Sequence, residues 1–153
     1  MKIVKRILLG LALVLLVMQF FRIDKSQPSV VPAQDFLTIY QPDVEVATLI
    51  KQTCYDCHSY QTEFPWYTNI APVSWWIKHH IDEGTEHLNF SIWGTYPAGK
   101  AAHKLEECAE EVEEGHMPLP SYTWMHGAAK LSDAQRQQLS AFFEGLYHEA
   151  EGH

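Results

Sequence analysis

The chain lacks the cysteines that a disulfide scaffold requires and the basic residues that a nucleic-acid-binding surface requires. It has three cysteines among 153 residues, whereas disulfide frameworks use an even number and a four-thiolate zinc site uses one more. Residues 1–33 hold five of the 11 basic residues and one of the 19 acidic residues, which leaves residues 34–153 with a net charge of −12. Because so acidic a segment repels phosphate backbones, we expect no nucleic-acid partner.

The sequence also has little of the strict apolar–polar alternation that marks strands, and helical spacing dominates instead. Asp43 is placed to cap a first helix, and Ser132 with Gln135 forms a capping box for the last one. Pro72 and Gly84 are expected to begin and to end a helix between them. We therefore predict an all-α domain with helices over about 43–53, 72–84, 101–114 and 132–149, and loops over 88–99 and 116–130.

The N-terminal residues follow the pattern of an export signal. Lys2, Lys5 and Arg6 precede an apolar run over 7–21. That run is shorter than the roughly 20 apolar residues that cross a membrane, and the small residues at 31–33 are far away for a cleavage site. We expect 1–25 to be a signal peptide or, by preference, an uncleaved inner-membrane anchor, 26–42 a linker, and 43–150 a domain facing the periplasm. A cleaved signal would leave the domain free in the periplasm.

The strongest motif is Cys54-Tyr55-Asp56-Cys57-His58, which has the C-x-x-C-H spacing of covalent haem attachment. Two thiols three residues apart can form thioether bonds to the two vinyl groups of one porphyrin. The adjacent imidazole of His58 then lies under the iron as its proximal ligand. The motif therefore predicts one covalently bound haem c, held by Cys54 and Cys57.

Other uses of two cysteines at this spacing are a thioredoxin-like dithiol, a disulfide and a zinc site. The dithiol needs strands on either side, which the sequence does not predict, and zinc needs two further ligands from elsewhere in the chain. Cys108 is expected to be a small buried residue of the helix over 101–114.

The second axial ligand of a six-coordinate haem is usually Met or His. Met117 follows a helix, precedes Pro118 and lies in a proline-containing loop, so it is the favoured distal ligand and could otherwise be a core filler. The sequence leaves six other candidates for the distal ligand: Met125, His116, His126, His79, His80 and His87.

Aromatic residues gather after the motif, at 64–67 and at Trp75 and Trp76. We expect them to pack the core and to cover the porphyrin edge; the alternative is an interface for a redox partner.

Several blocks of the sequence together resemble the haem-binding domain proteins of bacteria, which are small exported monohaem c-type proteins. The blocks span about residues 43–148 and read Cys54–Ser59, FPWY at 64–67, IAPVSWW at 70–76, HI at 80–81, Gly84, LNFS-x-W at 88–93, E-x-G-x-MPLPSY at 113–122 and AKLS at 129–132. The resemblance implies haem binding at Cys54, Cys57 and His58. Cys108 departs from it, since an aliphatic residue is expected there.

These observations predict a cytochrome-c-like all-α domain that transfers single electrons to an unidentified redox partner protein at the periplasmic side of the membrane, to which its N-terminal segment attaches it. The alternative is a haem-based redox or gas sensor, or a haem-binding accessory module, with an open or displaceable distal site. An enzyme is not expected: two-haem peroxidases need a second C-x-x-C-H, and Arg136 is the one arginine after the linker.

Overall fold

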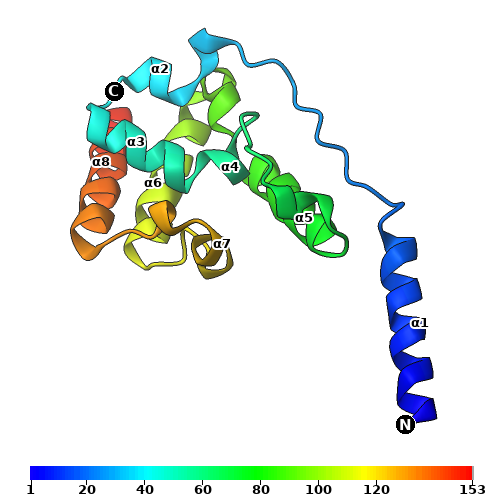
Figure 1. Cartoon of the computed structure of the whole chain (residues 1–153). Coiled ribbons are helices and arrows are strands. Elements are labelled where there is room, and N and C mark those ends of the chain that lie inside the picture. The colour runs from blue at the N-terminus through cyan, green and yellow to red at the C-terminus, as the bar shows by residue number, and fades with distance from the viewer. Residues whose placement is uncertain (153) are drawn as a thin grey trace.

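The computed structural model describes residues 1–152, and within that range every regular element is a helix (Figure 1). The all-α prediction is therefore confirmed. The α-helices are α1 (Lys2–Met18), α2 (Phe36–Tyr40), α3 (Val44–Thr53), α4 (Tyr55–His58), α5 (Val73–His87), α6 (Ala98–Glu113), α7 (Pro120–Met125) and α8 (Asp133–Glu151). Short 3₁₀ helices are η1 (Pro32–Gln34), η2 (Trp66–Asn69), η3 (Phe90–Thr95) and η4 (Gly127–Ala129).

The predicted helix starts are present with their side-chain caps. The Asp43 carboxylate accepts a hydrogen bond of 2.9 Å from Val46 N at the start of α3. Ser132 and Gln135 form the reciprocal capping box of α8, in which Ser132 N donates to Gln135 Oε1 at 3.0 Å. Caps of this kind satisfy backbone N–H groups that the first turn leaves unpaired, so they are readable from local sequence.

Short helices occupy the two segments that were predicted as loops. η3 lies within 88–99, and α7 and η4 lie within 116–130. Each has six residues or fewer, which is less than two turns and too short to display a helical period.

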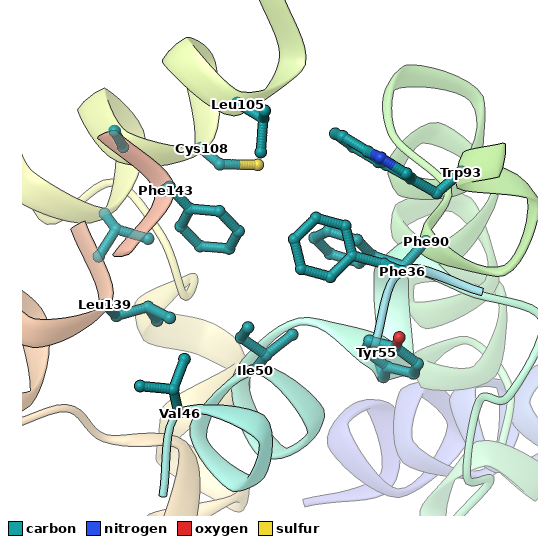
Figure 2. Close-up of a cluster of buried hydrophobic side chains, with 12 residues drawn as sticks. Phe36, Val46, Ile50, Tyr55, Phe90, Trp93, Leu105, Cys108, Leu139 and Phe143 are labelled. Carbon is teal, nitrogen blue, oxygen red and sulfur yellow. The ribbon is translucent and has the colours of Figure 1, made fainter. Parts of the chain in front are cut away.

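The core lies between α3, α6 and α8 on one side and α2 and η3 on the other (Figure 2). α6 packs along α8, and Val46 and Ile50 of α3 face Leu139 of α8. The expected packing of the helix before the cysteine motif against the C-terminal helix is thus present.

Phe36 is the centre of this core, although it lies in the segment 26–42 that is expected to be a linker. Its side chain is fully buried, and its ring lies 4.9 Å from the rings of both Phe90 and Trp93. Asp35 caps α2 at Leu37 N and accepts a hydrogen bond of 3.0 Å from the Tyr55 hydroxyl. Because α2 has only five residues, its sequence shows no periodicity, but the folded domain begins near Asp35 rather than at 43.

α1 extends away from the rest of the chain, and none of its side chains is buried (Figure 1). None of the helices within residues 1–152 has both the length and the apolar character needed to span a bilayer. The expected N-terminal membrane anchor is therefore not confirmed by the structure.

Replacing Phe36 by alanine should lower the free energy of unfolding by about 3–5 kcal/mol, because it opens a cavity between fully packed aromatic rings. Denaturant unfolding of the haem-loaded protein measures the loss. Val44→Ala is the control, because Val44 is 83% exposed and its truncation should change stability by less than about 0.5 kcal/mol. Equal effects of the two substitutions would contradict a core centred on Phe36.

Candidate functional site

The cysteine motif forms a single helical turn between α3 and α5. Cys54 both ends α3 and begins α4, and its carbonyl accepts hydrogen bonds from Cys57 N at 3.2 Å and from His58 N at 2.8 Å. Residues three and four positions apart on a helical turn lie on the same face. The turn therefore presents both thiols and the imidazole toward one side of α4.

These three side chains line a cavity of about 520 Å³, and Met117 lines the same cavity from the loop after α6. The structure thus brings Met117 to the same cavity as Cys54, Cys57 and His58, which precede it by about sixty positions in the sequence. Apolar wall residues include Leu88, Phe90, Val112, Leu119 and Phe143.

The backbone of α5 fixes the orientation of the His58 ring. His58 Nδ1 lies 2.9 Å from the Gly84 carbonyl oxygen and 3.3 Å from the Leu88 carbonyl oxygen. Because carbonyls only accept hydrogen bonds, this contact assigns the proton to Nδ1 and leaves Nε2 with a free lone pair. Burial lowers the pKa of His58, which favours the neutral, ligating form of the ring.

Gly84 permits this contact by letting α5 approach α4 closely. A Cβ atom at Gly84 would stand 2.5 Å from the Cys57 carbonyl oxygen. The prediction that Gly84 ends the helix is wrong, because α5 continues to His87. The glycine is required by a tertiary contact, which local sequence does not reveal.

A backbone hydrogen bond and an arginine side chain hold the loop that carries Met117. Gly115 has φ +80°, a left-handed conformation that ends α6 as expected, and Met117 N donates to the Glu111 carbonyl at 2.9 Å. Arg136 of α8 donates through Nη1 to the carbonyl oxygens of Val112 and of Met117, the latter at 3.1 Å. This role of Arg136 cannot be predicted from local sequence, because it depends on the packing of α8 against α6.

The two motif thiols are protonated at neutral pH. Burial raises the pKa of Cys54 and of Cys57 to about 11 each, and the neighbouring Asp56 charge adds to the effect at Cys57. Reactive dithiols need a lowered thiol pKa, so this environment does not favour thioredoxin-like chemistry. In the part of the chain that the structure describes, no cluster of three or more His, Cys, Asp or Glu side chains is arranged to bind a metal ion.

Cys108 is buried in the core beside Leu105 and Phe143, as expected for a small apolar residue (Figure 2).

A second cavity, of about 610 Å³, lies behind the wall formed by Cys57, Leu119 and Tyr122. The Tyr122 hydroxyl donates to Asp56 Oδ2 at 2.8 Å and so ties α7 to α4. Met125 and His126 line this second cavity and do not line the first.

The tryptophans after the motif do not pack the core as expected. Trp66 is 71% exposed and Trp76 is 49% exposed, whereas Trp93 of η3 is buried. The expectation is wrong because the core is filled by Phe36, Phe90 and Trp93, which leaves Trp66 exposed and Trp76 on the lining of the second cavity.

Comparison with known proteins gives one match. A family model described as "Haem-binding domain" matches residues 13–145, which is most of the chain. Neither the search of curated proteins nor the search of solved structures found a match.

Gly84→Ala should destabilise the protein by about 1–3 kcal/mol, because the added methyl group must push α5 away from the Cys57 carbonyl. Gly145→Ala is a matched control: Gly145 lies inside α8 with open space around its Cα, and alanine there should stabilise the helix by up to about 1 kcal/mol. Denaturant unfolding of both variants measures the difference. The same sign for both changes would contradict the close packing of α4 and α5.

Proposed function

Because the chain belongs to the haem-binding domain family, we propose that it carries one haem c, attached covalently through Cys54 and Cys57, with His58 as the proximal iron ligand. The observation that carries this proposal is the geometry of His58. Its Nδ1 is occupied by the Gly84 carbonyl, and its ring lines a cavity together with both thiols. A metal-ligating histidine ordinarily donates its other ring N–H to a carbonyl or carboxylate oxygen in this way.

The residues around the cavity fit a haem. The walls are largely apolar, which suits a porphyrin, and the two thiols lie on the same turn as the imidazole.

Met117 is the proposed distal ligand. It lines the cavity from the loop after α6, whereas His58 lines it from α4 and is held by α5. His80 and His87 also line the cavity, but they lie on α5, on the same side as the Gly84 carbonyl that binds His58. His116 is an exposed residue beside Glu111 and Glu114, and Met125 and His126 belong to the second cavity.

We propose single-electron transfer as the function and do not propose an enzyme. When bound, haem supplies a reversible one-electron change at its iron. The chain's own residues position and shield it: α5 orients His58, the apolar walls exclude water, and Arg136 fixes the backbone of Met117. A thioether ligand raises the reduction potential relative to two imidazoles. These roles support the proposal of a cytochrome-c-like electron carrier with an unidentified redox partner protein.

We propose that the domain works outside the cytoplasm. The basic residues before the apolar run of α1 support export, and covalent haem attachment in bacteria takes place outside the cytoplasmic membrane. The N-terminal segment would remain as a membrane attachment or be removed as a signal. N-terminal sequencing of the mature protein decides between these two outcomes.

Intact mass spectrometry of the denatured protein, made in a host that matures c-type haem, tests covalent attachment. The mass should exceed that of the chain by one haem. Cys54→Ser and Cys57→Ser should each remove one thioether bond and lower the yield of attached haem, while Cys108→Ser should keep both bonds, because Cys108 lines the cavity from α6 and lies outside the cysteine turn. An unmodified mass for the wild-type chain, with maturation working on a control cytochrome, would overturn the proposal.

Met117→Leu tests the distal ligand. The variant should keep its haem but show a lower reduction potential and faster binding of carbon monoxide to the ferrous protein, since leucine cannot ligate iron. Met125→Leu is the matched control and should behave like the wild type. If the wild-type protein itself binds carbon monoxide readily, and Met117→Leu changes nothing, the sensor alternative with an open distal site is favoured instead.

A further inference from the structure

The second cavity is bordered by an exposed apolar surface, here called the tryptophan face, made of the cavity residues Val73, Trp76, Trp124 and Met125 together with the exposed Trp66 beside Tyr67. Trp124 is 87% exposed, which is unusual for the side chain with the largest apolar area. Val73, Trp76, Trp124 and Met125 line one cavity, and the Trp66 ring lies 5.7 Å from that of Tyr67, which lines it too. Contiguous exposed apolar surface of this kind marks an interaction site.

The N-terminal helix is attached at the edge of the tryptophan face. Gln19, directly after α1, makes two hydrogen bonds with the backbone of Ala71, at 2.9 and 3.0 Å. The Trp75 indole donates to the Phe21 carbonyl at 2.7 Å. Ala71 precedes Pro72, which lines the second cavity, so the C-terminal end of α1 is fixed beside this surface. A bilayer that takes up α1 would therefore meet the tryptophan face.

The charges around this edge suit an anionic lipid surface. Arg22 and Lys25 follow α1, and Lys25 Nζ is held against Thr68 and Asn69 of η2 at 2.8 and 2.9 Å. Lys78 of α5 lies near the same segment, but its ion pair with Asp82 and the carboxylate of Asp24 partly offset the basic charge. By contrast, glutamates are concentrated on α6, on a different part of the domain. Basic groups next to a membrane-facing surface attract anionic headgroups.

From these observations we propose that the tryptophan face docks on the lipid bilayer and seats the domain on the membrane surface. The inference rests on the proposed membrane attachment of the N-terminal segment. Indole side chains are enriched at the headgroup level of membranes, where an apolar ring and a polar N–H are both accommodated. The second cavity then opens toward the lipid, and the glutamates of α6 remain available in water to a redox partner.

Photo-crosslinking in vesicles tests the proposal. The full-length, haem-loaded chain is reconstituted in phosphatidylcholine–phosphatidylglycerol vesicles that contain a phosphatidylcholine with a diazirine in its acyl chain, and adducts are mapped by mass spectrometry. Adducts are expected on α1 and also on the tryptophan face, at η2 and α7, but not on α6 or α8. Adducts confined to residues 1–21 would overturn the docking of the face while preserving membrane attachment.

Two variants test whether the exposed tryptophans are responsible for the adducts on η2 and α7. Trp66→Glu combined with Trp124→Glu changes only exposed side chains, so folding and haem attachment should persist, and the adducts on η2 and α7 should be lost while those on α1 remain. Val44→Glu, a charge placed on an equally exposed apolar residue of α3, should leave both sets of adducts unchanged. If residues 1–21 also carry no adducts, membrane attachment itself fails and the inference fails with it, whereas covalent haem is judged separately by mass.

Discussion

The hydrogen bond between His58 Nδ1 and the Gly84 carbonyl is the contact on which the site depends. It forms only because α5 comes within van der Waals distance of the Cys57 backbone, an approach that any side chain at position 84 would block. The same contact sets which ring nitrogen faces the cavity and joins the cysteine turn to the long helix that begins at Val73. One backbone carbonyl therefore links the helix packing to the ligand chemistry of the motif.

The rest of the fold holds in place the part of the cavity wall that is formed by the end of α6 and by Met117. α6 and α8 pack along one another, and Arg136 of α8 binds the carbonyls of Val112 and Met117 at the end of α6. Phe36, far away in sequence, fills the centre of the core behind Phe90, which is itself a wall residue of the cavity. The cavity that would hold the proposed ligands is thus supported by segments from both ends of the chain.

Features encoded by neighbouring residues could be predicted from the sequence, and features created by tertiary contacts could not. The cysteine motif and the cap at Ser132 are local, so their spacing alone identified them. The positions of Phe36, Gly84 and Arg136 in the fold depend on which helices meet, and short elements such as α2 carry no period from which to infer that. The exposure of Trp66 was missed for a related reason: aromatic content predicts burial only when the rest of the core is known.

The proposed site offers the imidazole of His58 and the thioether of Met117 to the same iron. X-ray absorption spectroscopy at the iron edge of the purified haem-loaded protein detects both ligands in one measurement. One sulfur ligand is expected in addition to the nitrogens of the porphyrin and of His58. A first coordination shell with nitrogen or oxygen alone would contradict the role given to Met117 and would reopen the distal position to a histidine or a small ligand.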